Sequence, residues 1–279
     1  MKLLLVDGSN LLFQMFFGMP ARIVNADGKP IQGTLGFVGA LLKIVRMTSP
    51  THMLVMFDGE RGSERSCLDE TYKANRPDFS DVPEDENPFS QLPDIYAALD
   101  HLGITHFESD GCEADDLIAA YALKYGRDND VVISSFDSDF WQLVTERVTV
   151  LRYRGDSTVI CDEAYIKARC GIEPNRYADF KSLTGDTSDN IKGADKIGPK
   201  TAAALINEFG GLEDIISSAD MIKKPSVRQS VIQNADRLRL NYRLIKLSGA
   251  AEVPADIGKI AYQYNGETTT EVLKAIGLR

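Results

Sequence analysis

The sequence predicts an α/β fold in which helices flank a mixed, mainly parallel sheet. Three short apolar runs have the length and composition of buried strands, at residues 2–6, 53–57 and 131–136. The segments with helical spacing are residues 33–47, 92–102 and 113–125. Strands that alternate with helices pair in parallel through right-handed crossovers, so helices cover both faces of the sheet.

Composition limits the class of protein. A chain of 279 residues with 43% hydrophobic content can bury one large core or two modest ones. The first apolar run is too short for a signal peptide, and Lys43 interrupts the apolar stretch 35–45. We therefore expect a cytoplasmic protein without a membrane span. The sequence shows no clear stripe of residues that would drive oligomerisation, so a monomer is expected.

The four cysteines are scattered along the chain and form no C-x-x-C pair, which argues against zinc and against a redox dithiol. No histidine lies near Cys112 in the sequence, so catalysis by this thiol is not expected.

Each of the three predicted strands is followed by aspartate. Asp7 follows the first, Asp58 the second, and Asp137 and Asp139 the third. One aspartate after a strand is an ordinary turn residue, whereas the repetition indicates a shared purpose. Because ligands gather beyond the carboxyl ends of parallel strands, we expect these side chains to meet there.

A further acidic group opens the helix predicted at 113–125. Glu113, Asp115 and Asp116 lie in its first turn, where Glu113 and Asp116 share a face. Acidic residues at a helix start can simply complement the helix dipole. Two neighbouring carboxylates repel each other unless a cation lies between them. This segment alone leaves both a metal site and a solvated helix start open.

Two segments depart from the alternation of strands and helices. Residues 148–152 and 157–161 flank the turn Arg154-Gly155-Asp156, which predicts a hairpin at the sheet edge. Residues 72–94 contain four prolines, which predict a loop or broken helices instead of one long helix. The acidic run 84–86 favours an ordinary exposed loop.

Helical patterns dominate from about Arg176 onward. Asp186 and Asp189 lie three residues apart in a predicted turn or cap. Pro199 inside the start and Gly210 past the end then bracket a helix. Backbone N–H groups at such a start bind phosphate, and Lys200 adds positive charge, although no apolar strand precedes the loop as a P-loop would require. The final residues, 251–279, carry no chemical motif and are expected to pack against the core.

Nine acids thus lie at predicted strand ends or helix starts: Asp7, Asp58, Glu113, Asp115, Asp116, Asp137, Asp139, Asp186 and Asp189. Carboxylates of this kind suit Mg²⁺ or Mn²⁺. Two such ions about 4 Å apart can activate water and stabilise the leaving oxygen of a phosphodiester, which predicts hydrolysis of nucleic acid. The net charge of −10 disfavours a nucleic-acid partner at first sight. Residues 192–246 are nevertheless locally basic, with ten Lys and Arg against six Asp and Glu.

Seven motifs occur in one order along the chain: Val6-Asp-Gly-Ser-Asn10, Phe57-Asp-Gly59, Tyr72-Lys-Ala-Asn-Arg-Pro77, Glu113-Ala-Asp-Asp116, Asp137-Ser-Asp139, Gly185-Asp-Thr-Ser-Asp-Asn-Ile191 and Ile197-Gly-Pro-Lys-Thr-Ala202. In these motifs the chain resembles the 5′→3′ exonuclease and flap endonuclease family of bacteria and their phages. Members of that family stand alone or form the amino-terminal nuclease domain of DNA polymerase I.

The resemblance implies a PIN-like nuclease domain at residues 1–175, with an arch or loop at about 72–94. It further implies a helical DNA-binding region at 176–279, which holds a helix-three-turn-helix of the helix-hairpin-helix type at about 182–212 and a C-terminal tail. The first-metal ligands would be Asp7, Asp58, Glu113, Asp115 and Asp116. The second-metal ligands would be Asp137, Asp139, Asp186 and Asp189.

The resemblance also assigns roles to basic and aromatic residues. Lys73 and Arg76 would contact the scissile phosphate and stabilise its developing charge, and Tyr72 would stack on a base. The hairpin would bind the duplex backbone without reading its sequence, with a K⁺ ion at its carbonyl groups. The residues assigned to DNA binding are Lys192, Lys196, Ile197, Gly198, Lys200 and Thr201.

The sequence departs from the family pattern at two places. Lys196 stands where the family has glycine, and the arch region is acidic instead of basic. The complete set of nine acids favours an active enzyme that uses two Mg²⁺ or Mn²⁺ ions on DNA with 5′ flaps, nicks or ends, with RNA–DNA primers as further candidates. The alternatives are a branched-DNA-binding protein of the same fold that does not cut, and a PIN-like ribonuclease.

Overall fold

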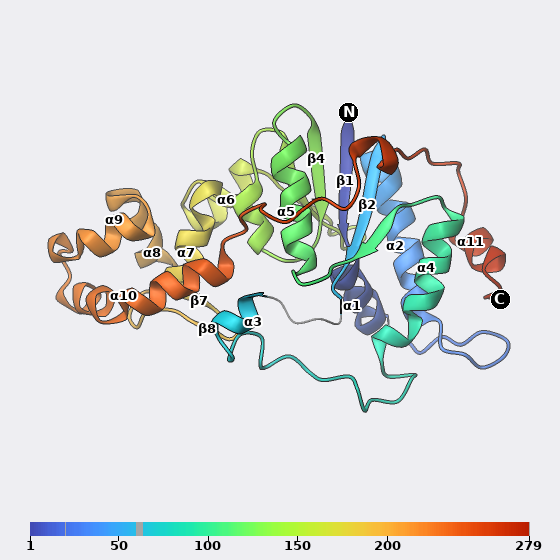
Figure 1. The fold of residues 1–279 in the computed structure, drawn as a ribbon, viewed down its shortest axis with the longest axis horizontal. Helices are drawn as coiled ribbons and strands as arrows, with labels where there is room; N and C mark the ends of the chain where they lie inside the picture. Colours follow the sequence, from blue (N-terminus) through green and yellow to red (C-terminus); the bar gives the residue numbers. More distant parts are fainter. Residues whose placement is uncertain (20, 60–63, 279) are drawn as a thin grey trace.

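The computed structural model describes residues 1–19, 21–59 and 64–278. Its main sheet has six strands in the order β3-β2-β1-β4-β5-β6 (Figure 1). The strands are β1 (Lys2–Asp7), β2 (His52–Phe57), β3 (His106–Glu108), β4 (Asp130–Ser134), β5 (Val148–Arg152) and β6 (Val159–Cys161). All neighbouring pairs are parallel except β5 and β6, which form the predicted edge hairpin. The predicted mixed, mainly parallel sheet is therefore confirmed.

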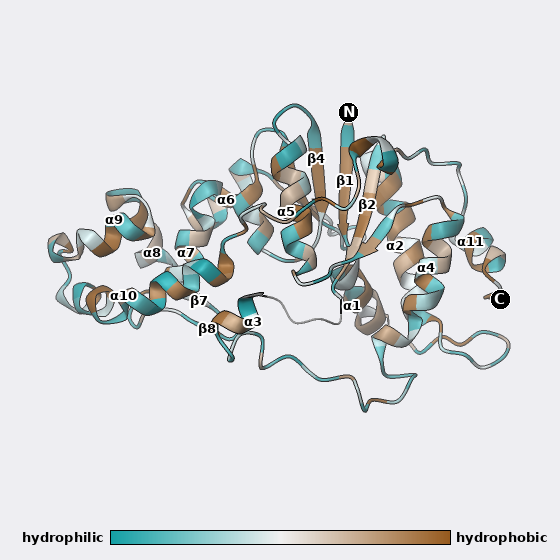
Figure 2. Cartoon of the chain, viewed as in Figure 1, coloured by the Kyte–Doolittle hydropathy of each residue, from teal (hydrophilic) through white to brown (hydrophobic). Residues whose placement is uncertain are grey.

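Alternating side chains of the central strands β1 and β2 belong to two separate apolar layers, one on each face of the sheet. Figure 2 shows these strands as hydrophobic along most of their length. Leu3 and Leu5 pack in the layer that contains α5 (Ala114–Tyr125), whereas Leu4 and Val6 pack in the other layer. The helices of that second layer are α1 (Gly8–Gly18), α2 (Gln32–Thr48) and α4 (Leu92–His101). Burial on both faces explains why these strands read as continuous apolar runs.

The register of the strands brings their acidic ends together. β1 lies between β2 and β4, with Asp7 opposite Met56 and Val6 opposite Ser134. The residues that follow β2 and β4 therefore emerge beside Asp7 at one edge of the sheet.

Two elements differ from the sequence-based expectation. Helix α1 begins directly after β1, in a segment for which no helix was predicted. The Asp7 side chain accepts a hydrogen bond from the Asn10 backbone N–H at 3.0 Å and caps the helix. The short strand β3 was not predicted, since three residues carry too little periodicity. As expected, no long helix crosses residues 72–94; the segment contains turns, η1 (Pro88–Gln91) and the start of α4.

The C-terminal region forms a helical lobe beyond β4 and α5, on the side of the sheet away from β2 and α2 (Figure 1). Its elements are α6 (Glu163–Cys170), η3 (Pro174–Arg176), α7 (Tyr177–Thr184), β7 (Gly185–Asp186), β8 (Ile191–Lys192), α8 (Pro199–Phe209), α9 (Leu212–Ser217), η4 (Ala219–Met221) and α10 (Pro225–Ile245). The tail crosses back to the sheet, where the Tyr262 N–H donates to the Thr51 carbonyl at 2.9 Å. Beyond η5 (Ile257–Ile260), helix α11 (Thr269–Ala275) buries Val272 against α2 and α4, so the tail packs on the core as expected. Across the described ranges, every helix is too short or too polar to span a bilayer.

Candidate active site: two acidic groups and their cations

The first acidic group consists of Asp7, Asp58, Glu113, Asp115 and Asp116, which come from the ends of β1 and β2 and from the start of α5. The Ser135 hydroxyl donates to Asp7 Oδ2 at 2.8 Å, and this bond joins the ends of β1 and β4. The Ala114 N–H donates to Asp58 Oδ1 at 3.0 Å, which holds the start of α5 against the end of β2. Glu113 and Asp116 form a capping box.

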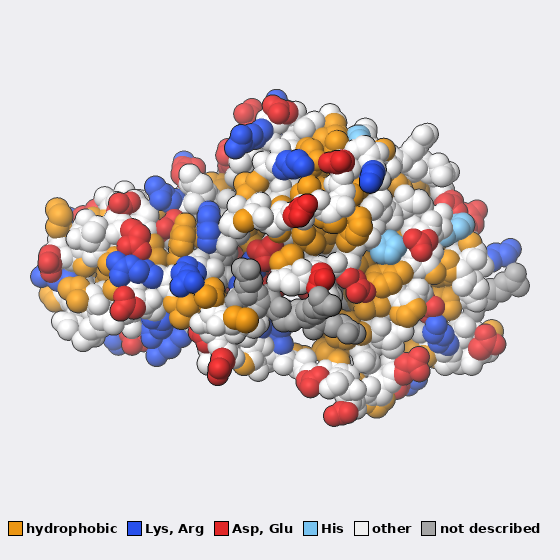
Figure 3. Space-filling model, viewed as in Figure 1, with side chains coloured by type: hydrophobic (Ala, Val, Ile, Leu, Met, Phe, Trp, Pro, Cys, Tyr) orange, Lys and Arg blue, Asp and Glu red, His pale blue; other side chains and the backbone are white. Residues whose placement is uncertain are grey.

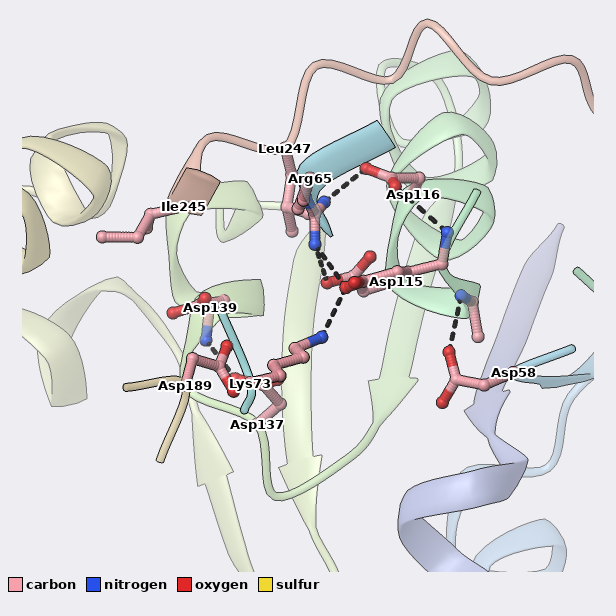
Figure 4. A network of polar contacts seen from close by, with 12 residues as sticks. Asp58, Arg65, Lys73, Asp115, Asp116, Asp137, Asp139, Asp189, Ile245 and Leu247 are labelled. Carbon is pink, nitrogen blue, oxygen red and sulfur yellow. Dashed lines mark hydrogen bonds and ion pairs between the residues drawn. The ribbon is translucent and has the colours of Figure 1, made fainter. Parts of the chain in front are cut away.

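A buried arginine neutralises three of these acids. Arg65, on the short helix α3 (Glu64–Leu68), is 7% exposed and points between the carboxylates (Figure 4). Its Nη1 lies 2.7 Å from Glu113 Oε2 and 2.7 Å from Asp115 Oδ2, and its Nη2 lies 2.5 Å from Asp116 Oδ1. A guanidinium fork suits this multiple pairing with carboxylates.

The second acidic group consists of Asp137, Asp139, Asp186 and Asp189. One carboxylate oxygen of each of the last three lies within 4.8 Å of the others. The Asp139 backbone N–H donates to Asp137 Oδ1 at 2.8 Å. The Lys181 ammonium, from α7, lies 2.5 Å from Asp139 Oδ1 and also pairs with Asp186. Each acidic group therefore contains a buried side-chain cation.

The base of the arch segment connects the two groups. Lys73 Nζ pairs with Glu113 at 2.5 Å, while its backbone N–H donates to the Asp189 carbonyl at 3.0 Å. Arg76 Nη2 lies 2.9 Å from Asp189 Oδ1. Lys73 has a backbone φ of 57°, in the left-handed region that side chains other than glycine rarely adopt. Such strain at a site of clustered charge is typical of functional residues.

Burial changes the protonation of the acids. Burial, with Asp58 nearby, raises the pKa of Asp7 to about 7. Burial also raises the pKa of Asp115 to about 7, although Arg65 opposes the shift, and it raises the pKa of Asp139. For Asp186 the Lys181 ammonium outweighs burial, so the pKa of this carboxyl is lowered. Buried carboxyls with raised pKa values gain most from an added cation.

The chemistry of the two groups fits divalent metal ions. Asp115 Oδ1 is buried and has no hydrogen-bond partner within the described part of the chain, so it offers a lone pair that a cation would satisfy. The donors of both groups are hard carboxylate oxygens, as Mg²⁺ and Mn²⁺ prefer. Carboxylate oxygens of the two acidic groups are therefore suited to hold divalent ions.

A cavity of about 750 Å³ opens beside both groups. Its wall includes Asp7, Asp58, Glu113, Asp115 and Asp137, together with the Lys73 and Arg76 cations. The cavity wall is therefore mainly negative, with Lys73 and Arg76 at its margin. A phosphodiester is also negative, so it can bind there only when further cations are present.

The structure contradicts the expectation that Tyr72 stacks on a base. The Tyr72 ring is 6% exposed and packs with Ala178, Leu244 and Ile245. Its hydroxyl donates to Glu113 Oε2 at 3.2 Å, so the residue supports an acid of the first group. The motif Tyr72-Lys-Ala-Asn-Arg-Pro77 signals nothing about this packing, because the partners of the Tyr72 ring lie more than 100 residues away.

The residues expected to bind DNA lie on one segment that runs from the end of β8 to the first turn of α8. Lys192, Lys196, Gly198 and Lys200 are exposed, and Thr201 is half-buried at the start of α8. The Ile197 side chain is buried in the core, so only its backbone can face a ligand. Lys196 has a φ of 67°, which means that lysine adopts the conformation glycine would favour there. Blue side chains are visible on this helical lobe in Figure 3.

Sequence reasoning missed both buried cations. Arg65 lies in a five-residue helix and Lys181 in a short helix that is buried over nearly its whole length, and neither stands in a recognisable motif. The one available signal is chemical: nine carboxylates in one place require compensating positive charge.

Comparisons with known proteins agree with this geometry. The family model "5'-3' exonuclease, N-terminal resolvase-like domain" matches residues 2–171, and "5'-3' exonuclease, C-terminal SAM fold" matches residues 172–267. The chain is 33% identical over 259 residues to thermostable DNA polymerase I of Thermus thermophilus, and 35% identical over 263 residues to DNA polymerase I of Rhizobium leguminosarum. These alignments cover 92% and 91% of this chain but 30% and 25% of the polymerases, so the chain spans less than a third of their length.

A solved structure has the same architecture. The phage T5 D15 protein, co-crystallised with metal ions, matches with a TM-score of 0.73 and 25% identity, over 88% of this chain and 90% of that one. The family and the PIN-like fold with its C-terminal helical region are thus confirmed, and the chain belongs to the 5'-3' exonuclease family.

Proposed function

We propose that this chain is a structure-specific 5′ nuclease that hydrolyses DNA phosphodiesters at 5′ ends and 5′ flaps, in DNA replication or repair. The observation that carries the proposal is the convergence of nine acids from distant segments in two neighbouring groups, five of which line one cavity together with Lys73 and Arg76. A DNA-binding protein of the same fold that does not cut would have no need of so costly a concentration of buried carboxylates.

Two divalent ions, Mg²⁺ or Mn²⁺, complete the site. The first would be held by Asp7, Asp58, Glu113, Asp115 and Asp116, and the second by Asp137, Asp139, Asp186 and Asp189. When bound, such ions lower the pKa of water and stabilise charge on phosphodiester oxygens. The T5 D15 protein was co-crystallised with metal ions, which supports a metal-dependent site in this chain.

The chain's own cations would position the substrate. Lys73 and Arg76 project from the base of the arch and would bind the scissile phosphate, where their charge counters the charge that develops during cleavage. To bind the phosphate, Lys73 must release its ion pair with Glu113, and Arg76 must release its ion pair with Asp189. Phosphate oxygens then replace these carboxylates. The left-handed backbone at Lys73 fixes the direction from which its ammonium approaches.

The hairpin and the start of α8 would hold the duplex part of the substrate. Lys192, Lys196 and Lys200 are exposed there, and the free N–H groups at the start of an eleven-residue helix bind phosphate. A K⁺ ion on the hairpin carbonyls is part of this proposal, because Lys196 keeps the backbone conformation that glycine favours. Binding through phosphates should weaken as salt rises.

Cleavage of an end-labelled 5′-flap duplex tests the proposal. The wild-type protein should cut it with Mg²⁺ or Mn²⁺ and not with EDTA, leaving 5′-phosphate and 3′-hydroxyl ends. Asp116→Ala should abolish cutting while DNA binding persists. If wild type binds flaps but never cuts them, the protein is a silent branched-DNA binder. If it cuts only single-stranded RNA, the PIN-like ribonuclease alternative holds.

A further inference from the structure

Helix α10 is hydrogen-bonded to the hairpin that is proposed to hold the duplex, residues 192–198. Three side chains of α10 each donate to a backbone carbonyl of this hairpin: Ser230, Arg237 and Asn241. The Asn241 amide nitrogen lies 3.0 Å from the Lys192 carbonyl oxygen. Arg237 Nη2 lies 2.8 Å from the Gly193 carbonyl oxygen. The Ser230 hydroxyl reaches the Asp195 carbonyl oxygen. We call the three side chains the α10 donors.

The α10 donors share one buried face of the helix. Steps of seven and four residues separate them, which are close to whole turns of an α-helix. Ser230 is 5% exposed, Asn241 is 3% exposed, and Arg237 is half-buried. A buried polar group costs free energy unless it is hydrogen-bonded. The hairpin carbonyls therefore cannot move away from these donors without a loss of stability.

The hairpin depends on such bonds because it has little regular structure. β8 contains two residues and pairs with β7 in a two-stranded sheet. Ala194 and Ile197 are buried and attach the hairpin to the core, but apolar contacts have no preferred direction. Hydrogen bonds do have one. The α10 donors therefore determine the direction in which the exposed Lys192 and Lys196 face the duplex.

The hairpin runs antiparallel along α10. Its bonded carbonyls follow in the order 192, 193 and 195, while their donors follow in the order 241, 237 and 230. The tip of the hairpin thus lies toward the start of the helix, and its base lies toward the end. Figure 1 shows α10 extending through the helical lobe toward α3.

The end of α10 is attached to the second acidic group. Gln142 donates its side-chain amide to the Asp139 carbonyl at 2.9 Å and to the Ile245 carbonyl at 3.0 Å. Its Oε1 accepts a hydrogen bond from the Leu247 N–H at 3.0 Å. Figure 4 shows Ile245 and Leu247 beside the acids. One helix therefore connects the hairpin with an acid that is suited to hold a metal ion.

The helix between these two contacts is stiff. Its sequence contains no glycine or proline from residue 226 to residue 245, and these residues are common causes of kinks. From Ser230 to Ile245 the axis is about 22 Å long, at roughly 1.5 Å per residue. A duplex rises by about 3.4 Å per base pair, so this length corresponds to about six or seven base pairs.

We propose that the α10 donors are positioning residues that determine which phosphodiester is cut. They fix the hairpin at one distance from the acidic groups, so the duplex on the hairpin presents one phosphate to Lys73 and Arg76. This inference rests on the proposed nuclease function. Loss of a donor lets the hairpin tilt, and the cut then spreads to neighbouring phosphodiesters.

Product lengths from a 5′-end-labelled flap duplex test the proposal. In single turnovers with Mg²⁺, wild type should give one main product. Arg237→Met keeps the apolar stem but cannot donate to the Gly193 carbonyl, so its products should spread to neighbouring positions. Its duplex affinity in EDTA should fall about twofold to tenfold. Ser230→Ala removes a donor without removing charge and should spread the products in the same way.

Matched variants separate positioning from direct contact with DNA. Arg239→Met removes the same charge from the same helix, where Arg239 pairs with Glu213 on α9, and should give wild-type products. Arg237→Lys can still donate to the Gly193 carbonyl and should restore one main product. The slope of log affinity against log salt should be equal in Arg237→Met and wild type, because Arg237 donates to the protein backbone and not to phosphate.

Other results would overturn the proposal. Wild-type products from folded Arg237→Met and Ser230→Ala would show that the α10 donors do not select the bond. A salt slope reduced by about one in Arg237→Met would make Arg237 a phosphate contact instead. Thermal unfolding identifies a variant that fails to fold, and Ser230→Ala then decides alone. A wild-type protein that cuts no flap refutes the proposed function itself.

Discussion

The guanidinium of Arg65 lies 2.7 Å from the Asp115 carboxylate, although 50 residues separate the two in the chain. This contact places a side-chain cation among acids that are suited to hold a metal ion. Breaking a buried pair by removing one partner costs about 3–5 kcal/mol, because the other charge is left uncompensated. The stability of the protein without metal therefore depends on this arginine.

Arg65→Gln should lower the melting temperature strongly in EDTA. Mg²⁺ or Mn²⁺ should raise it more in the variant than in wild type, since a divalent ion then supplies the missing positive charge. Thermal unfolding with and without metal measures both effects. Arg147→Gln is the control, because its pair with Asp130 is exposed and such pairs contribute at most about 1 kcal/mol. Equal metal-induced shifts in wild type and Arg65→Gln would contradict the idea.

Lys181 is expected to compete with metal in the second acidic group. Its ammonium pairs with Asp139 and Asp186, so an ion binding there must displace or repel it. Lys181→Met should therefore tighten Mn²⁺ binding on the order of tenfold, a change of about 1.4 kcal/mol. Titration calorimetry measures the affinity. Lys167→Met, which removes an exposed ion pair with Glu173, should leave it unaltered. Weaker binding in Lys181→Met would show that the lysine supports the ligands instead.

The sequence predicted the acids and missed the cations for a physical reason. Asp7, Asp58, Asp137 and Asp139 follow strands, and parallel pairing brings the ends of such strands together whatever the rest of the chain does. The local pattern of an apolar strand followed by aspartate was therefore enough to predict these acids. Arg65 reaches partners 48 to 51 residues away, and that contact depends on how α3 docks on α5. No local pattern encodes such docking.

Tyr72 is a second residue whose packing could not be predicted from local sequence. Its motif predicted a place near the site, and the hydroxyl does contact Glu113. Whether the ring is open or covered depends on α10, whose Leu244 and Ile245 cover it. The helical character of the chain beyond Arg176 was predicted, whereas the packing of α10 against the arch base was not.

The stability of the metal-free protein should fall as pH rises through the range between about 4 and 7. The pKa of Asp7 is raised from 3.8 to about 7, so the native state holds a proton that the unfolded state releases near pH 4. Stability falls with pH wherever the native state binds more protons. Asp7→Asn should remove part of this slope in denaturant unfolding followed in EDTA. Asp130→Asn, at an exposed position, should not. A slope identical in Asp7→Asn and wild type would refute the assignment.

Lys196 should carry a conformational strain that glycine relieves. Its φ of 67° lies in the left-handed region, where a side chain costs roughly 1–2 kcal/mol, partly offset by the greater freedom of glycine in the unfolded chain. Lys196→Gly should therefore be more stable than Lys196→Ala by about 1 kcal/mol in denaturant unfolding. Both variants lose the exposed ammonium, so both should bind duplex DNA more weakly and with a shallower salt dependence. If the two variants are equally stable, the left-handed turn does not persist in solution. If K⁺ strengthens duplex binding in Lys196→Gly and in wild type alike, the hairpin carbonyls hold the ion whichever residue occupies this position.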